Sequence, residues 1–202
     1  KIKGKFIWTK KKHKTGTDRI FEAYKKISKK LNCEYIINLQ GDEPFINPKD
    51  IVNLNNNIIS KNSDIGTIGN KITKADFIDK SIVKVITYNN IEKKKISRAE
   101  NCLRECKYQK KNAYGHIGIY QFRTSILKKF VNLRQSKNEI KHRLEQLRAI
   151  ENGINIDVVY SKNKSFGIDT VEDYVEIKKI MEYKIKKLWK LFIKDLPVPT
   201  LI

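Results

Sequence analysis

The sequence predicts an α/β fold, in which helices cover a layered sheet that has an antiparallel excursion in its middle. Strand-like and helix-like segments alternate along the 202 residues, and such alternation is typical of α/β proteins. The apolar run at residues 34–39 stops at the sequence Gln-Gly-Asp-Glu-Pro, as a buried strand does where it leaves the core. Hydrophobic residues make up 40% of the chain and charged residues 32%, which indicates one globular domain with a sizeable core.

The predicted strands of the first half are short apolar runs with β-branched or aromatic residues, bounded by turn residues. A turn at Asn89-Asn90 leads the last of them into residues 91–97, so these two segments are predicted to form a hairpin. This hairpin is the antiparallel excursion. The strands before the turn are predicted at residues 5–8, 34–39, 65–68 and 81–87.

Two helices are predicted between these strands. The first covers residues 18–31, with Thr17 or Asp18 as its N-cap. The second follows Asn47 and ends near Ser60, and Pro48 suits its first turn because proline has no N–H group to leave unpaired.

The second half of the chain continues the alternation. The helix predicted at residues 138–151 carries apolar residues at helical spacing and ends at Asn152-Gly153. The other elements are a strand at 115–122, a short helix from Thr124, a strand at 154–160 and a final helix from Thr170 to Lys190.

The net charge of +21 comes from 43 basic and 22 acidic residues, and it raises the question of nucleic-acid binding. The lysines are spread along the whole chain, and no RNP-like aromatic motif, zinc knuckle or recognition helix accompanies them. We therefore expect a solvated basic surface that attracts anionic substrates, and no nucleic-acid partner. A basic nucleic-acid-binding protein is the alternative.

The cysteines are Cys33, Cys102 and Cys106, an odd number. Because no secretory signal is visible in these residues, we expect a cytoplasmic protein with reduced thiols. The spacing of Cys102 and Cys106 is compatible with half of a metal site, but no second pair or suitably spaced histidine completes it, so no zinc site is expected.

Two carboxylates, Asp42 and Glu43, stand where the strand at residues 34–39 leaves the core. Ligands of open α/β sheets bind beyond the carboxyl ends of strands. A carboxylate there can hold Mg²⁺ and, through it, the phosphates of a nucleotide. The alternative is a polar turn after a core strand.

Six motifs, taken in order, resemble those of the 3-deoxy-manno-octulosonate cytidylyltransferase (CMP-Kdo synthetase) family. Each is weak alone, whereas the ordered set with fitting gaps is specific and covers about residues 1–180. The motifs are Gly-Thr-Asp-Arg at 16–19, Asn-Leu-Gln-Gly-Asp-Glu-Pro at 38–44, Ser-Arg at 97–98, His-Ile-Gly-Ile-Tyr at 116–120, Leu-Glu-Gln-Leu-Arg at 144–148 and Gly-Ile-Asp-Thr-Val-Glu-Asp at 167–173.

The resemblance implies a nucleotide-diphospho-sugar-transferase-like fold with a small antiparallel subdomain. We assign residues 1–176 to this domain and residues 177–202 to a basic amphipathic C-terminal helix and tail, for which membrane contact is not expected. The implied reaction is attack of the anomeric hydroxyl of Kdo on the α-phosphorus of CTP, for lipopolysaccharide synthesis in the bacterial cytoplasm by a homodimer. The alternatives are another sugar acid, such as 8-amino-Kdo or a nonulosonic acid, and an inactive remnant.

The resemblance also implies roles for individual residues. The catalytic, Mg²⁺-binding residues would be Asp42 and Asp169. Sugar-acid contacts would come from Gln40, Arg98, His116, Tyr120, Glu145 and Gln146, and nucleotide contacts from Gly16, Thr17, Arg19 and Gly41.

Each role has a structural alternative. Thr170 and Asp173 fit a capping box, which would leave Asp169 as a loop residue. Arg98 alone reads as a surface charge and His116 as a core histidine. Glu145 and Gln146 fit a solvated helix face, and the motif at residues 16–19 fits a helix start.

Two departures from the family qualify these roles. The family begins with a strand and a phosphate-binding loop that contains glycine and arginine and ends in lysine, to which nothing here corresponds; we expect either a fragment or a loss of that half of the nucleotide site, with one unpaired sheet edge. After Arg98 the family has a segment with proline and further basic contacts, whereas residues 99–106 contain no proline. The sugar and dimer contacts of that segment are therefore in question.

Overall fold

The structure is a computed structural model that describes residues 6–29, 33–105, 110–164, 167–168 and 170–194. The described strands form one six-stranded sheet with the order β1-β5-β2-β6-β4-β3. The strands are β1 (Tyr35–Leu39), β2 (Ile65–Asn70), β3 (Lys84–Thr87), β4 (Ile96–Leu103), β5 (Ala113–Arg123) and β6 (Ile156–Ser161). The helices are α1 (Gly16–Ile27), α2 (Pro48–Ser60), α3 (Lys74–Ile78), α4 (Ile91–Lys94), α5 (Thr124–Val131), α6 (Lys137–His142), α7 (Gln146–Glu151) and α8 (Val171–Lys194).

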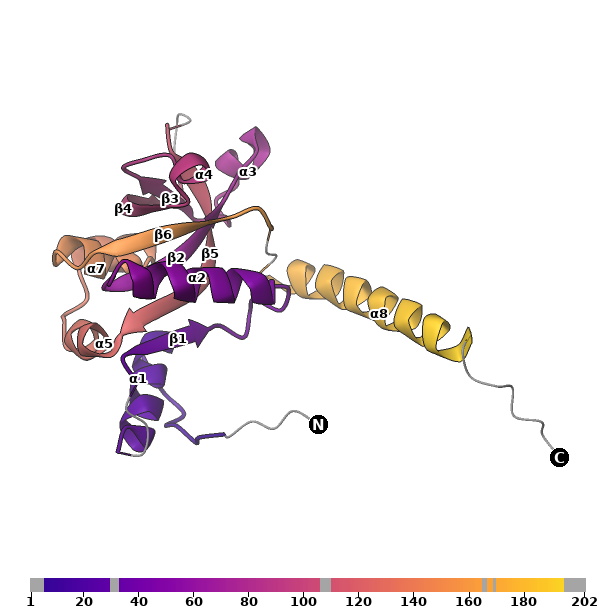
Figure 1. The fold of residues 1–202 in the computed structure, drawn as a ribbon, viewed down its shortest axis with the longest axis horizontal. Helices are drawn as coiled ribbons and strands as arrows, with labels where there is room; N and C mark the ends of the chain where they lie inside the picture. Colours follow the sequence, from indigo (N-terminus) through magenta and orange to yellow (C-terminus); the bar gives the residue numbers. More distant parts are fainter. Residues whose placement is uncertain (1–5, 30–32, 106–109, 165–166, 169, 195–202) are drawn as a thin grey trace.

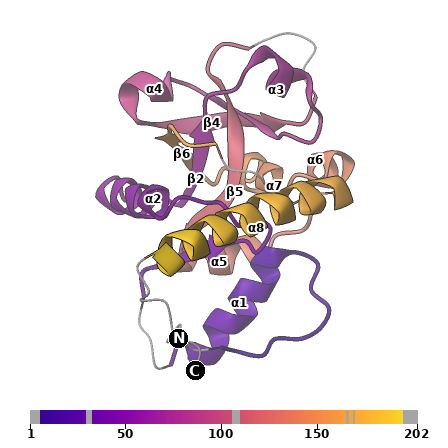
Figure 2. The same cartoon turned by 90° about the vertical axis from the view of Figure 1, so that its right-hand side faces the viewer.

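Strand β5 organises the sheet because it is long enough to pair with three others, β1, β2 and β3, all antiparallel. Strands β2 and β6 pair in parallel, as expected of the α/β part. Strands β3 and β4 pair antiparallel and, with α3 and α4, form the small subdomain at the top of Figures 1 and 2. The predicted layered sheet with an antiparallel excursion is confirmed.

Helices cover both faces of the sheet, and alternate side chains of β5 pack toward each. Ile117 and Ile119 belong to a cluster with Leu54 and Ile58 of α2. Tyr120, Phe122 and their neighbours belong to the larger cluster on the other face, which includes side chains of α5 and α7. Helix α8 extends away from this body (Figure 1) and runs without a break across the predicted division after residue 176.

Helix α2 begins as the sequence predicts. The side chain of Asn47 accepts a hydrogen bond from the backbone N–H of Lys49, and Pro48 lies in the first turn. At α1 the predicted caps are wrong, because Thr15 caps the helix by accepting from the backbone N–H of Asp18. That shift places Thr17 inside the helix.

Three predicted elements differ from the structure. Residues 6–8 form no strand, and Phe6 and Trp8 are each more than 80% exposed, since none of the described strands pairs with this segment. Residues 91–94 form a helical turn that ends at Lys95 with a positive φ of 68°, so the return strand begins at Ile96. The connection is therefore longer than a hairpin turn, although the strands pair antiparallel as expected.

The helix predicted at residues 138–151 is two helices. Arg143 adopts a left-handed conformation (φ 53°) that ends α6 before α7 begins. Leu144 and Leu147 are buried, whereas Ile140 is 62% exposed, so the apolar residues do not form one continuous stripe. This break determines where Glu145 lies.

No helix among the described residues combines the length and the apolar character that crossing a membrane requires.

Candidate active site

One cavity of about 530 Å³ is lined by six of the twelve predicted site residues. It lies where the β1–α2 loop, the middle of β5 and the α6–α7 junction meet segments of the small subdomain. The sequence-predicted residues that line it are Gln40, Asp42, His116, Tyr120, Glu145 and Gln146.

The acidic loop, residues 40–43, forms one side of this cavity. The backbone N–H of Glu43 donates to the carbonyl of Gln40 (3.3 Å), which closes the turn after β1. The Glu43 carboxylate accepts from the backbone N–H of Gly118 (2.9 Å), and a Cβ at Gly118 would lie only 3.0 Å from that oxygen. A glycine at this position therefore lets the loop approach β5 closely.

The side chain of Asp42 is exposed and has no hydrogen bond or ion pair with another described residue. Its carbonyl oxygen accepts from the backbone N–H of Ile168 (2.9 Å), which brings the chain next to Asp169 up to the acidic loop. Asp169 itself lies outside the described residues. The capping box is observed: Thr170 N–H donates to the Asp173 carboxylate (2.8 Å), and Asp173 N–H to the Thr170 hydroxyl (3.1 Å).

The oxygen ligands of the acidic loop fit a hard cation such as Mg²⁺, which prefers carboxylate oxygen and keeps several waters. The free carboxylate of Asp42 supplies one such ligand at the cavity. Within the described ranges, no three His, Cys, Asp or Glu side chains cluster as a metal site. Cys106, one member of the sequence pair weighed for zinc, is outside those ranges.

His116 and Tyr120 project from β5 on the same face, with ring centroids 5.2 Å apart. The hydroxyl of Thr67 donates to the carbonyl of Ile119 (2.7 Å), so it accepts from Nε2 of His116 (2.9 Å), and Nδ1 is left as an acceptor. Burial lowers the pKa of His116 to about 4 and raises the pKa of Tyr120 well above its usual value. Both rings are therefore neutral hydrogen-bonding groups at pH 7.

Glu145 reaches the cavity because the helix is interrupted at Arg143, between α6 and α7. Its Oε2 accepts from the hydroxyl of Thr17 (2.8 Å), and its Oε1 lies 3.6 Å from Nη2 of Arg148. Burial raises the pKa of Glu145, although the hydroxyls of Thr17 and Thr15 and the charge of Arg148 act in the opposite direction. The carboxylate is thus held in place, but these groups offset only part of the effect of burial on its pKa.

Arg148 is itself fixed by a buried ion pair. Its Nε donates to Oε2 of Glu139 (2.8 Å) and its Nη2 to Oε1, and both side chains are less than 5% exposed. The guanidinium also lies over the ring of Phe130, 4.6 Å from its centroid. Because two buried charges are paired in bidentate geometry, Arg148 is a rigid backing for Glu145.

Gln146 is nearly buried and hydrogen-bonds the thiol of Cys102. Burial raises the pKa of that thiol to about 12, so Cys102 is a neutral core residue on β4. The structural alternative for Glu145 and Gln146, a solvated helix face, does not hold, because both lie at the start of a new helix beside the core and line the cavity.

The other predicted site residues that the structure describes do not line the cavity. Arg98 is exposed on β4, where its backbone pairs with that of Asp157 on β6. Arg19 donates to the hydroxyl of Thr9 (2.8 Å) and the carbonyl of Lys10 (3.0 Å), so it fastens the N-terminal segment to α1. Gly16 begins α1, Thr17 lies behind Glu145, and Gly41 sits in the turn between two lining residues.

Sequence reasoning missed the cationic residues of the cavity, Arg104, Arg143 and Lys164. Arg104 follows β4, six residues beyond Arg98, because that strand extends to Leu103 rather than ending at Ser97. Beneath it, the ammonium of Lys84 is fully buried and donates to the carbonyls of Arg104 (3.1 Å) and Asp79. The sequence did offer one signal for this position, because Arg104 is a basic residue in the segment that follows Ser97-Arg98.

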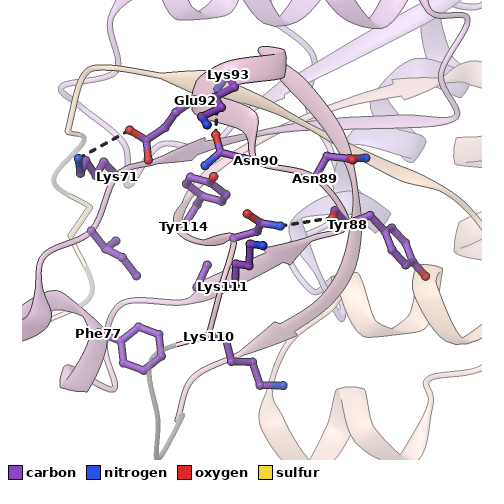
Figure 3. A pocket seen from close by; sticks show the side chains of 13 residues that line it. Lys71, Phe77, Tyr88, Asn89, Asn90, Glu92, Lys93, Lys110, Lys111 and Tyr114 are labelled. Carbon is purple, nitrogen blue, oxygen red and sulfur yellow. Dashed lines mark hydrogen bonds and ion pairs between the residues drawn. The ribbon is translucent and has the colours of Figure 1, made fainter.

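A second hollow of about 520 Å³ lies on the small subdomain (Figure 3). Aromatic side chains and lysines surround it, and Lys71 pairs with Glu92 at 3.7 Å. None of the predicted site residues line it, so the cavity that contains Asp42 is the candidate active site.

Comparisons with known proteins identify the family. The model of the family described as "Cytidylyltransferase" matches residues 1–185. The 3-deoxy-manno-octulosonate cytidylyltransferase of Thermodesulfovibrio yellowstonii is 43% identical over 180 residues, which are 84% of this chain and 71% of that protein. The Rickettsia prowazekii enzyme of the same name is 37% identical over 190 residues, 93% of this chain and 74% of that protein.

Solved structures agree with this assignment. The structure of CMP:2-keto-3-deoxy-manno-octonic acid synthetase complexed with CTP has a TM-score of 0.78 and 30% identity, and the match covers 90% of this chain and 74% of that one. An apo UDP-glucose pyrophosphorylase, with a TM-score of 0.60, 14% identity and coverage of 87% and 62%, shares the fold. The predicted nucleotide-diphospho-sugar-transferase-like fold is therefore confirmed, and the chain belongs to the 3-deoxy-manno-octulosonate cytidylyltransferase family of nucleotidyltransferases.

Proposed function

We propose that this protein transfers CMP from CTP to the anomeric hydroxyl of Kdo and releases pyrophosphate, in the cytoplasm, as a step toward lipopolysaccharide. The observation that carries the proposal is a single cavity with the exposed carboxylate of Asp42 on one side and hydrogen-bonding side chains on another, among them Glu145, which Thr17 holds in place. The relatives that bear this activity in their names align over 84–93% of the chain.

The acidic loop would serve the nucleotide. Asp42 and Asp169 would hold Mg²⁺, and the contact between Asp42 and Ile168 supports a shared site. When bound, the ion would offset triphosphate charge and orient the α-phosphate for in-line attack. The new bond joins the anomeric oxygen to the α-phosphorus as the bond to the pyrophosphate oxygen breaks, so the protein's task is positioning and charge stabilisation.

The sugar acid would bind on the side of β5 and the α6–α7 junction. Arg104, rather than the exposed Arg98, has the position and charge to pair with the carboxylate of Kdo. Sugar hydroxyls would meet neutral or acceptor groups, which suits a polyhydroxylated substrate. These groups are Gln40, His116, Tyr120, Glu145 and Gln146.

We also propose that the protein acts as a homodimer. Exposed apolar side chains on the first three turns of α8 support this, because Val171 and Tyr174 are more than half exposed and Met181 is 44% exposed. Sedimentation equilibrium measures the mass directly, and a monomer at assay concentrations would contradict the proposal.

The test of the activity is pyrophosphate release by the purified protein with CTP, Kdo and Mg²⁺. We expect release that EDTA and Asp42→Asn abolish. Glu100→Gln is the matched control, because it removes one exposed carboxylate from β4, outside the cavity. Release that Asp42→Asn leaves unchanged would overturn the assignment of the acidic loop.

Two comparisons in the same assay separate the alternatives. Faster release with 8-amino-Kdo or a nonulosonic acid would change the substrate and keep the chemistry. Absence of release with every acid, together with salt-sensitive nucleic-acid binding that Asp42→Asn does not alter, would favour a binding protein.

A further inference from the structure

Thr17 is buried at the start of α1 but does not cap that helix. Its side chain is 1% exposed, and the capping hydroxyl belongs to Thr15. The hydroxyl of Thr17 instead donates to Oε2 of Glu145, 128 residues further along the chain, at 2.8 Å. A helix start that resembles a nucleotide-binding motif is thus bonded to a carboxylate of the cavity wall.

Besides the Thr17 hydroxyl, only the Thr15 hydroxyl and the charge of Arg148 favour the ionised form of Glu145 among the described residues. Nε and Nη2 of Arg148 are committed to Glu139, and Arg148 reaches Oε1 of Glu145 only at 3.6 Å. That oxygen is buried and has no hydrogen-bond partner among the described residues. Burial works against the charged form of Glu145, and the hydrogen bond from Thr17 is the largest of the effects that favour that form and holds Oε2 on the side of α1.

We propose that Thr17 is a positioning residue for the sugar half of the active site, acting through Glu145 rather than through the nucleotide. The inference rests on the proposed function, in which Glu145 meets a hydroxyl of Kdo. A carboxylate that accepts from a substrate hydroxyl must be held in the productive rotamer, and a small displacement of a positioned group is costly. Thr17 supplies that restraint from behind, out of contact with the cavity.

Two substitutions at one position provide the test. Thr17→Val keeps the shape of the buried side chain and removes the hydroxyl, whereas Thr17→Ser keeps the hydroxyl. Thr17→Val is expected to raise the KM for Kdo about tenfold, as loss of a hydrogen bond to a charged group does, and to change the KM for CTP less than about twofold. Thr17→Ser is expected to behave like the wild-type protein.

Double substitution separates positioning through Glu145 from any other role. In a Glu145→Gln background, Thr17→Val should add little, because the two residues act as one unit. Additive effects would overturn the proposal, as would equal changes in the KM values for Kdo and CTP. An equal defect in Thr17→Ser would also overturn it, since the loss would then be one of packing.

A readout without turnover keeps this inference distinct from the proposed function. The titration of Glu145 can be followed by carboxyl NMR in the 202-residue chain, where the charged groups that face it are Arg148 and Asp18. Thr17→Val should raise the pKa of Glu145, because the lost bond favours the ionised form. An unchanged pKa would refute the brace even if no sugar acid were turned over, whereas a raised pKa in an inactive protein would leave only the proposed function contradicted.

Discussion

The two sides of the active-site cavity hold their charged groups in different ways. On the side proposed to bind the sugar acid, called the sugar side below, Glu145 accepts a hydrogen bond from Thr17 and lies beside Arg148, whose own charge is paired inside the core. On the acidic loop, Asp42 carries an exposed carboxylate without a partner among the described residues. One side is assembled before substrate arrives, whereas the other presents charge that a bound cation and nucleotide would complete.

This difference has an energetic meaning. Buried groups of the sugar side contribute to folding and are proposed to contribute to binding, so substitutions there are expected to change both stability and affinity. The exposed carboxylate of Asp42 contributes little to folding, so its replacement is expected to affect turnover alone. The following substitutions test whether the two sides separate in this way.

The largest effect is expected at the acidic loop. Asp42→Asn should lower kcat by about 1,000-fold or more, because a proposed ligand of the ion that stabilises developing charge is lost. The melting temperature should stay within about 1 °C of the wild-type value, since the side chain is exposed. Thermal denaturation beside the pyrophosphate assay measures both, and a large loss of stability would erase the contrast between the two sides.

The next effect is expected in the core behind the sugar side. Arg148→Met should destabilise the fold by about 3–5 kcal/mol, because it leaves Glu139 buried without its partner. The pKa of Glu139, which Arg148 lowers against the effect of burial, should rise in this variant. Urea denaturation measures the change in unfolding free energy.

A control for that experiment removes both charges. Glu139→Leu combined with Arg148→Met should recover much of the lost stability, as apolar replacement of a buried pair often does. If the single variant were as stable as the wild-type protein, the ion pair would not be the structural support that its burial indicates.

A smaller effect is expected from the arginine that lines the cavity. Arg104→Gln should raise the KM for Kdo by about 10- to 100-fold, because a charge-assisted bond to the sugar carboxylate is lost, and it should leave the KM for CTP nearly unchanged. Arg98→Gln is the matched control on the exposed part of β4 and should alter neither constant. If Arg98→Gln raised the KM for Kdo and Arg104→Gln did not, Arg98 would be the residue that pairs with the Kdo carboxylate, as the sequence motif predicts.

The sequence was sufficient for features that depend on local signals. The strand that ends at Leu39, just before the acidic loop, and the helix that begins at Pro48 are confirmed, because apolar runs, glycine and proline act within a few residues. The ordered motifs also named six residues that the fold brings to one cavity, from Gln40 to Gln146. Their individual roles stay predictions.

Features that depend on distant contacts were not predictable from the sequence. The bond between Thr17 and Glu145 needs the relative placement of α1 and α7, which no local pattern specifies. The position of Arg104 needs the register and length of β4, and a continuous apolar spacing concealed the break at Arg143. In each case tertiary packing decided between local alternatives of similar energy.

The smallest expected effect concerns pH and the sugar side alone. Burial lowers the pKa of His116 to about 4, below the ordinary value of 6.5, so the unfolded chain binds a proton more readily than the folded one between these pH values. Stability should therefore be fully present above pH 6.5 and decline as the pH falls toward 4. His116→Gln, which can still hydrogen-bond Thr67, should flatten that part of the profile, whereas the exposed His142→Gln should not.

Urea midpoints measured across this range decide the matter, and identical profiles for the two variants would mean that His116 is protonated as easily in the fold as outside it. In that case His116 would carry charge at mildly acidic pH, and the sugar side would not be the neutral, preassembled surface that distinguishes it from the acidic loop.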